Sequence, residues 1–577
     1  MAMHKVYRKV VNMVALSRDT LTFTYLPLSS YRRCSNFLFG IVDQLNSPTA
    51  IKQELCNANQ YSQQDIHELN DQELVKIMAI THSTSWTSRS FKPLTLRKWF
   101  QINVEDECCR RLHNMDKQLW LNLVHISSSP HVPIRSRFTK ALAKRTEREL
   151  DSIDDLSTMT KLFQLFAERG SKFQFLNKLE QRLARNIKDI NLQDIIPLYH
   201  GVAKNKTKHK PLLSALIDHA CRNLNHLDDI SIRNLVLMLT KCRVFNMELI
   251  FDIAAISILK LSNWSPYTVG VIAWAFAKHL IYNRELFEAV GQHFVNNHQQ
   301  YGQYDVAQVL YSFAKVNFKP SNSKEFFSAI ENLLNRSYDN YNPKFLLNIA
   351  WSMVILQRYH RPLFAKVFDP TFLQKCQSNS GLSRVDKVQL CQIDLAVKLE
   401  YGDGSSEFSL PLPLRNQIIK TLANLQRITS TIEIEVQQAM ERIFGGKQYF
   451  GSEISLECGY SLDMAFVLDD RNRALLWRDF DSIRLNEDIF AVLDTKRNPL
   501  RKVAVEVDGS HHFAYKTRRP LGDTLLKHRL LKALGWQIIS IPYFEWHQVH
   551  GSLETEESYL RRKICGTNQM MELMDAV

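Results

Sequence analysis

Patterned cysteines and long apolar segments are both missing from this sequence. Its 10 cysteines contain no C-x-x-C pair and show no close, regular spacing. Neither a zinc site nor a disulfide framework is therefore indicated, and most thiols are expected to act as small core residues in a reducing compartment. No apolar run approaches the ~18 residues that a membrane-spanning helix needs, so no membrane span is predicted.

Acidic side chains are nearly absent from the first 40 residues. Asp19 is the single acid there, against the basic residues Lys5, Arg8, Lys9, Arg18, Arg32 and Arg33. A basic, hydroxylated and acid-poor start is typical of an organellar transit peptide, because import uses a positively charged amphipathic helix. We predict a transit peptide and basic arm in residues 1–60. A disordered basic arm without a targeting role is the alternative.

Positive charge is in excess and unevenly distributed. The 73 Lys and Arg side chains outnumber the 59 Asp and Glu side chains, which gives a formal net charge of +14 at pH 7. Residues 431–577 hold slightly more acids than bases, so the excess lies in residues 1–430. A strongly basic chain suggests an anionic partner, most simply nucleic acid, and we expect its phosphate-binding surface before residue 431.

One pattern recurs between residues 155 and 360: an apolar helical stretch that ends in a small residue followed by a polar or basic one. The copies are LFQLFAERG, IPLYHGVAKNK, LVLMLTKCR, IAWAFAKHL, VLYSFAKVN and IAWSMVILQ, with the small residue at Ala167, Ala203, Thr240, Ala277, Ala314 and Val354. These anchor residues are spaced 36, 37, 37, 37 and 40 positions apart. A second apolar helix follows each anchor, as in RELFEAVGQHF and KEFFSAIENLL.

A helical hairpin cannot bury its own apolar face, so regularly spaced hairpins must stack on one another. We therefore predict an α-solenoid of helical-hairpin repeats over residues 151–370. The helical text in residues 61–150 is interpreted as further, degenerate units.

A lysine follows the anchor in four consecutive copies, at Lys204, Lys241, Lys278 and Lys315. Equivalent positions line up in a solenoid, so these lysines are candidate RNA-binding residues that would track a phosphate backbone. The alternative is that they offset the macrodipole at the helix C-terminus, which contributes up to about 1 kcal/mol each. Trp274 and Trp351, two or three residues before their anchors, are interpreted as core residues rather than base-stacking platforms.

The periodicity changes after a junction at residues 371–430, which is rich in Ser, Gly and Pro and contains one more helical segment, VDKVQLCQIDLAVKL. Residues 431–565 read as a helix (STIEIEVQQAMERIF), the strands YSLDMAFVL, IFAVLDT and VAVEVDG, a helix (TLLKHRLLKALG) and the strand QIISIPYFEW. This order predicts a small α/β domain, in which Gly535 ends the last helix.

Three acids lie within the strand-like runs of this domain. Side chains alternate along VAVEVDG, so Glu506 and Asp508 point to one face, and Asp463 in YSLDMAFVL is the third acid. Buried carboxylates are costly unless they are paired or bind metal, so with Lys527 they form a candidate catalytic site that could hold Mg²⁺ and cleave a phosphodiester. The alternative is that they pair with Arg or Lys or accept bonds from backbone amides, and Asp508-Gly509 is a strong turn signal.

The stretch VAVEVDGSHHFAYKTRRPLGDTLLKHRLLKALGWQIISIPYFEW resembles a RAP domain, at about residues 503–563. The similarity lies in the Glu-x-Asp-Gly strand, the following His-Phe, the basic Leu-rich helix, and Gly-Trp before an Ile-x-x-Ile-Pro strand. RAP domains resemble a trimmed PD-(D/E)XK nuclease fold, which implies that Asp463 and Glu506 correspond to its metal-binding acids. The lysine two residues after the second acid is absent here, because Asp508 stands in its place. Lys527 is a candidate replacement, but the departure favours a non-catalytic use of the fold.

A ~37-residue helical repeat before a RAP domain also resembles heptatricopeptide and octotricopeptide RAP proteins and, in layout, the FAST kinase family. The resemblance implies a mitochondrial protein that binds single-stranded or ribosomal RNA and acts in RNA processing, stability or translation. The sequence has no Gly-rich loop followed by a strand lysine and no His-Arg-Asp loop, so kinase activity is not expected. A metal-dependent endoribonuclease and a scaffold that binds mitochondrial ribosomal proteins are the alternatives.

Overall fold

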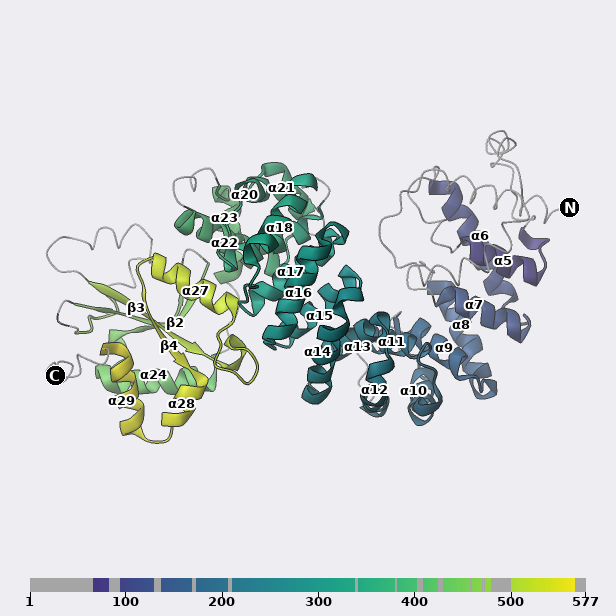
Figure 1. Ribbon diagram of the computed structural model, residues 1–577, viewed down its shortest axis with the longest axis horizontal. Helices are drawn as coiled ribbons and strands as arrows, with labels where there is room; N and C mark the ends of the chain where they lie inside the picture. The colour runs from purple at the N-terminus through teal and green to yellow at the C-terminus, as the bar shows by residue number, and fades with distance from the viewer. Residues whose placement is uncertain are drawn as a thin grey trace. The chain divides into compact units, whose positions relative to one another are not determined.

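The structure is a computed structural model, and a defined part of the 577-residue chain can be described. This part comprises residues 66–81, 94–128, 136–168, 173–205, 210–337, 341–378, 381–401, 408–423, 429–456, 459–469, 471, 473–478 and 500–565. The predicted transit peptide and arm (1–60) and the predicted strand IFAVLDT (489–495) lie outside the described residues. The chain divides into two compact units, Met1–Ile253 and Ala254–Val577, and each is described by itself (Figure 1).

The described part of the first unit is helical. Its helices are α5 (Asp71–Thr81), α6 (Leu94–Arg111), α7 (Lys117–Ser127), α8 (Ser136–Glu149), α9 (Leu156–Glu168), α10 (Phe175–Arg185), α11 (Ile195–Asn205), α12 (Lys210–Asn223) and α13 (Asp229–Cys242), while α14 (Met247–Lys260) crosses the unit boundary. α9, α11 and α13 pack on one another in that order, and α10 packs on α12. Each hairpin is thus covered by the next, as the repeat predicts.

The second unit begins with the same arrangement. Its repeat helices are α15 (Pro266–Lys278), α16 (Arg284–Asn297), α17 (Gln303–Lys315), α18 (Ser323–Ser337) and α19 (Pro343–Ile355), followed by α20 (Arg361–Val367), α21 (Pro370–Ser378), α22 (Arg384–Glu400) and α23 (Leu412–Ala423). α15, α17, α19 and α22 pack in one row. α22 is the helix expected in the junction, and it lies on α19 as the next member of this row. α23 was not predicted.

Local chemistry explains where the first helix of a hairpin starts and stops. The Ser265 hydroxyl accepts a hydrogen bond from the Thr268 N–H, and Pro266 occupies the first turn of α15, where no backbone donor is needed. A residue with positive φ follows each of α13, α15, α17 and α19 and ends the helix in the left-handed conformation. These residues are Arg243 (φ 54°), Leu280 (59°), Asn317 (50°) and Gln357 (57°).

A four-stranded sheet forms the centre of the C-terminal domain. Its strands β1 (Gly451–Ser455), β2 (Ser461–Leu468), β3 (Arg501–Asp508) and β4 (Gln537–Pro542) lie in the order β1-β2-β3-β4. The first two pairings are antiparallel and the β3–β4 pairing is parallel, with α27 (Gly522–Ala533) in the crossover. The sheet's hydrophobic core is shared with α24 (Thr431–Phe444), α28 (Tyr543–Val549) and α29 (Leu553–Cys565). Figure 1 shows these three helices on one face and α27 on the other.

The predicted fold class, an α-solenoid followed by a small α/β domain, is confirmed. Two details differ from expectation: β1 was not predicted, and QIISIPYFEW is a strand only as far as Pro542. The rest of that segment turns into α28, because this places Trp546 inside the core, where its Nε1–H donates to Glu435 at 2.8 Å. No helix in the part that the structure describes is long and apolar enough to cross a membrane.

Candidate functional site

The four predicted RNA-binding lysines lie in the last turn of their helices. Lys204 is in α11, Lys241 in α13, Lys278 in α15 and Lys315 in α17. The first three are exposed, whereas Lys315 is partly buried. α11 packs on α13 and α15 packs on α17, so each unit carries two of these lysines on neighbouring helices. A lysine in the last turn can contact a phosphate, and its charge also offsets the helix macrodipole.

An aromatic residue precedes each lysine of the second unit by four positions. Trp274 precedes Lys278 and Tyr311 precedes Lys315, and Trp351 occupies the same place in α19. Residues four apart share one face of a helix. The Lys278 Nζ lies 2.9 Å from the Tyr311 hydroxyl oxygen and 4.7 Å from the centre of its ring. The Tyr311 and Trp351 rings stack with centroids 6.1 Å apart.

A second aromatic row lies two turns earlier on the same helix faces. Tyr267 on α15 and Tyr304 on α17 are each 39% exposed, and their ring centroids are 5.8 Å apart. Tyr304 contacts Phe345 of α19 edge to face at 5.3 Å. Positions separated by seven and eleven residues fall within one narrow stripe of a helix. We call Tyr267, Trp274, Lys278, Tyr304 and Tyr311 the aromatic–lysine stripe.

Sequence reasoning did not single out the tyrosines of the stripe. It interpreted Trp274 and Trp351 as core residues. Trp351 is 7% exposed and donates its Nε1–H to Gln392 Oε1 at 2.6 Å, whereas Trp274 is only partly buried. The available signal was the recurrence of an aromatic ring at a fixed distance from the anchor in consecutive repeats.

The equivalent positions of the first unit carry Gln164, His200 and Leu237, none of which is Trp, Tyr or Phe. Gln164 Nε2 donates to Glu168 Oε1 at 2.6 Å, and the Nδ1 of His200 lies 2.6 Å from the same oxygen. His200 precedes Lys204 by four residues, as Trp274 precedes Lys278. One fixed position of the repeat therefore carries different side chains along the chain.

The C-terminal domain contacts the C-terminal ends of three repeat helices within the second unit. The Tyr515 N–H donates to the Leu280 carbonyl after α15 at 2.7 Å. Arg519 donates to the Asn317 carbonyl after α17 at 2.5 Å, and Arg529 donates to the Val354 carbonyl of α19 at 2.8 Å. The segment that resembles a RAP domain therefore bonds to backbone carbonyls at and just after the C-terminal ends of these helices, where few intrahelical donors remain.

Lys315 takes part in the same contact. Its Nζ lies 2.6 Å from Asp523 Oδ2 of α27, and its side chain is 16% exposed. A Cβ on Gly522 would stand 1.9 Å from the Ala314 carbonyl oxygen, so the close approach of α27 requires glycine there. Lys315 is therefore engaged by the C-terminal domain, whereas Lys278 is exposed, although both lysines follow an anchor residue of the repeat.

The structure brings the three acids and Lys527 together on the α27 side of the sheet. The Lys527 Nζ forms an ion pair with Glu506 Oε2. Asp463 Oδ2 accepts the Val507 backbone N–H at 2.6 Å, and Asp508 Oδ2 accepts the Ser540 hydroxyl at 2.5 Å. Glu506 and Asp508 therefore lie on one face of the sheet, as the alternation along β3 predicts, and each of the three acids has a partner from the protein.

Burial controls the charge of this acid cluster. It raises the pKa of Glu506 to about 8 against the opposing effect of Lys527, and it raises the pKa of Asp508 as well. Burial also lowers the pKa of His528, on α27 beside Asp508, to about 4. Among the described residues, no group of three or more His, Cys, Asp or Glu side chains could hold a metal ion. The donors around Asp463 and Glu506 do not fit Mg²⁺ as arranged, and we derive no step through a metal.

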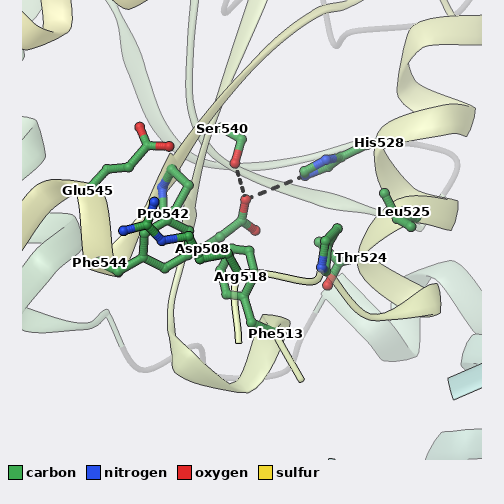
Figure 2. Close-up of a pocket in the computed structure, with 11 residues that line it drawn as sticks. Asp508, Phe513, Arg518, Thr524, Leu525, His528, Ser540, Pro542, Phe544 and Glu545 are labelled. Atoms are coloured by element: carbon green, nitrogen blue, oxygen red, sulfur yellow. Dashed lines mark hydrogen bonds and ion pairs between the residues drawn. The ribbon is translucent and has the colours of Figure 1, made fainter. Parts of the chain in front are cut away.

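A pocket of about 320 Å³ opens beside Asp508 (Figure 2). Asp508, Ser540 and His528 meet in it, as Figure 2 shows, and Thr524 and Leu525 of α27 form one wall. The remaining lining residues come from the loop after β3 and the start of α28, and they are Phe513, Arg518, Pro520, Pro542, Phe544 and Glu545. Sequence reasoning missed His528 and Ser540, because neither stands in an acid-bearing strand motif.

Family models match three segments of the chain. The model for FAST kinase-like protein subdomain 1 matches residues 306–377, that for FAST kinase-like protein subdomain 2 matches residues 387–476, and that for the RAP domain matches residues 505–563. The RAP domain predicted at about residues 503–563 is confirmed. The two FAST kinase-like segments cover α17–α22 and continue as far as the β2 region of the C-terminal domain.

The chain is similar to several curated proteins named as FAST kinase domain-containing proteins. The chain is 24% identical to FAST kinase domain-containing protein 3, mitochondrial, of Bos taurus over 501 residues, which is 83% of this chain and 72% of that protein. It is 22% identical to human FAST kinase domain-containing protein 4, over 73% of this chain and 66% of that protein. The match to FAST kinase domain-containing protein 5, mitochondrial, of Pongo abelii is 21% identical over 68% of this chain and 61% of the relative. The names of these relatives bear out the predicted mitochondrial localisation.

Proposed function

We propose that this protein is a mitochondrial RNA-binding protein that acts in RNA processing, stability or translation, and that its repeats contact single-stranded RNA. The aromatic–lysine stripe is the observation that carries the proposal. Exposed aromatic rings beside a basic group are what single-stranded nucleic acids need, because bases stack on the rings while phosphates pair with the cation. The RAP domain and the mitochondrial relatives support the same function.

The arrangement of the stripe fits a backbone that passes from one repeat to the next. Lys278 of α15 contacts Tyr311 of α17, so cation and ring belong to successive hairpins. The equivalent positions of the first unit carry Gln164, His200 and Leu237 instead of Trp or Tyr. Variation at one repeat position is also what base reading by helical repeats requires.

The acid cluster supports a structural role rather than an endoribonuclease. Glu506 pairs with Lys527. Asp463 accepts a hydrogen bond from the Val507 amide, and Asp508 accepts one from the Ser540 hydroxyl. Hydrolysis of a phosphodiester needs a group that stabilises developing negative charge, and Asp508 has the wrong sign for it. We therefore propose that the nuclease-like fold is used here for recognition.

A triple substitution of the exposed lysines tests RNA binding. Replacing Lys204, Lys241 and Lys278 by Gln should reduce the slope of log K against log salt by about 2, at ~0.7 per single-strand phosphate contact. Folding should survive, because each exposed substitution typically changes stability by no more than about 0.5 kcal/mol. The measurement is fluorescence anisotropy of a labelled oligouridine at several salt concentrations.

Lys315→Gln is the matched control, because the Lys315 Nζ is held by Asp523. It should leave the salt slope unchanged. A folded triple variant with an unaltered slope would show that these lysines serve helix ends. It would favour the scaffold alternative, in which the repeats bind mitochondrial ribosomal proteins and release few counterions.

A further inference from the structure

The pocket beside Asp508 has the composition of a small-molecule site. Its volume of about 320 Å³ is at the lower end of the ~300–1,000 Å³ typical of ligand pockets, so it has room for about one nucleoside. The walls are apolar or aromatic, with Phe513, Leu525 and Phe544 among them. A few polar groups converge between these walls, which is the usual way that a pocket fixes the orientation of a ligand.

The floor of the pocket accepts hydrogen bonds. The side chain of Asp508 is 3% exposed, and Ser540 donates to its Oδ2. Its Oδ1 lies 3.6 Å from the Nδ1 of His512, which is beyond hydrogen-bond length. Two carboxylate oxygens have about four acceptor positions, so the bond from Ser540 leaves acceptor capacity for a ligand. A phosphate is excluded from this floor by its charge, and a group with N–H donors is favoured.

A second polar group lies beside this acceptor. The Nε2 of His528 is buried without a hydrogen-bond partner among the described atoms and lies 3.8 Å from Asp508 Oδ2. Burial lowers the pKa of His528 to about 4, so its ring is neutral near pH 7 and its Nε2 can donate one hydrogen bond in one tautomer. The pocket can thus present two acceptor oxygens next to one donor.

We propose that this pocket binds a guanine base through Asp508 and His528. Guanine is the RNA base that presents two neighbouring N–H donors, N1–H and the N2 amino group, next to an acceptor, O6. Asp508 would accept from the two donors and His528 would donate to O6. Adenine and cytosine each present one amino donor next to a ring-nitrogen acceptor, and uracil presents one N–H between two acceptors, so none of them matches this edge.

The rim of the pocket fits the phosphate of the same nucleotide. Arg518 is exposed, and its guanidinium carbon lies 5.1 Å from the centre of the Phe544 ring. Figure 2 shows Arg518 and Phe544 together on the side of the pocket opposite His528. Arginine pairs well with phosphate oxygens, so base and phosphate would be bound at opposite ends. The inference deepens the proposed function, because it gives the RAP segment a base-reading role in RNA recognition.

A series of nucleoside monophosphates tests the pocket in the full-length protein. GMP should bind at least about tenfold more tightly than AMP, CMP or UMP, since one bidentate pair discriminates by roughly that factor or more. IMP, which retains N1–H and O6 but lacks the N2 amino group, should fall between GMP and AMP. Isothermal titration calorimetry measures the five affinities. Equal affinities, or binding of none of the five, would overturn the proposal without any variant.

Two variants and a control test which residues cause the preference for GMP over AMP. Asp508→Asn replaces one acceptor oxygen by a donor, so GMP should lose its advantage over AMP. Arg518→Gln should weaken GMP and AMP alike and leave their ratio unchanged. Glu554→Gln removes an exposed carboxylate on α29 and should change nothing. A guanine preference that persists in folded Asp508→Asn protein would contradict the assignment.

Competition distinguishes the source of the base and separates this proposal from the proposed function. An oligouridine with a single guanosine should displace GMP if RNA supplies the base, whereas displacement by free GTP alone would identify a free nucleotide as the ligand. The triple lysine variant should bind GMP normally but RNA weakly. A triple lysine variant that still binds RNA as tightly as the parent protein would therefore count against the stripe alone, and RNA binding by the parent protein without any guanine preference would count against the pocket alone.

Discussion

The stripe on α15 and α17 and the acid cluster on β2 and β3 differ in what the protein itself needs from them. The stripe has two tyrosines that are each 39% exposed and an exposed lysine, Lys278. The acids are 8% exposed or less, and each is bonded to another group of the domain. Exposed groups are available to a ligand, whereas Glu506 and Asp463 are engaged by Lys527 and by the Val507 amide, and Asp508 alone of the three acids lines the pocket.

Breaking the buried ion pair should have the largest effect. At pH 9, above the Glu506 pKa of about 8, Glu506→Ala leaves the Lys527 ammonium, whose side chain is 19% exposed, without its partner in a poorly solvated site. Removing one member of such a pair typically costs about 3 kcal/mol or more, because the remaining charge is uncompensated. Denaturant unfolding followed by circular dichroism measures the free energy of unfolding. The matched control Glu554→Ala should change it by less than about 0.5 kcal/mol.

A loss below about 1 kcal/mol in Glu506→Ala would mean that the pair is solvated in the folded protein. The acids would then be as available to a ligand as the stripe is. That result would remove the distinction between the two regions and would reopen the catalytic interpretation of Asp463, Glu506, Asp508 and Lys527.

Removing one ring of the stripe should affect RNA binding rather than folding. Tyr304→Ala is expected to weaken single-stranded RNA binding by about 1–3 kcal/mol, the range measured for a base stacked on an aromatic side chain. Phe251→Ala is the control, because Phe251 is 52% exposed but lies on α14, outside the stripe. Fluorescence anisotropy measures both affinities. Equal losses in the two variants would show that RNA has no preference for the stripe.

The regular part of the molecule could be predicted from the sequence. A spacing of 37 residues between anchors reports a repeat directly, and it places the lysines after Ala203 and Ala277 in last turns, where the structure has them. Alternation along VAVEVDG likewise places Glu506 and Asp508 on one face of the sheet. These inferences use the 37-residue spacing of the repeats and the two-residue alternation along a strand, and both can be read directly from the sequence.

Contacts between distant segments could not be predicted. Lys315 and Asp523 are 208 residues apart, and Arg529 and Val354 are 175 apart. Their pairing depends on where α27 packs against the repeat helices. Sequence periodicity gives no information about such a contact between distant segments. The end of β4 was missed for a similar reason, since Tyr543–Val549 forms a helix in order to bury Trp546 against residues of α24.

The smallest expected effect is a pH dependence of stability. The folded protein raises the pKa of Glu506 from 4.5 to about 8, so between these values the folded state holds a proton that the unfolded state has released. The free energy of unfolding therefore falls as pH rises through this window. His528 acts in the opposite direction below pH 6.5, because its pKa is lowered from 6.5 to about 4 and the unfolded state binds the proton there.

Of these two groups, Glu506 alone should titrate between pH 6.5 and 8. The parent protein is expected to lose stability over this range, at less than about 1.4 kcal/mol per pH unit, which is the limit for one whole proton. Glu506→Gln cannot titrate, so its stability should decline less steeply. Unfolding midpoints at pH 6.5, 7.0, 7.5 and 8.0 give both slopes, and other titrating groups cancel in their difference. Parallel slopes would show that Glu506 is already ionised at pH 6.5 and that Lys527 outweighs the effect of burial, so the cluster would have the electrostatics of an exposed ion pair.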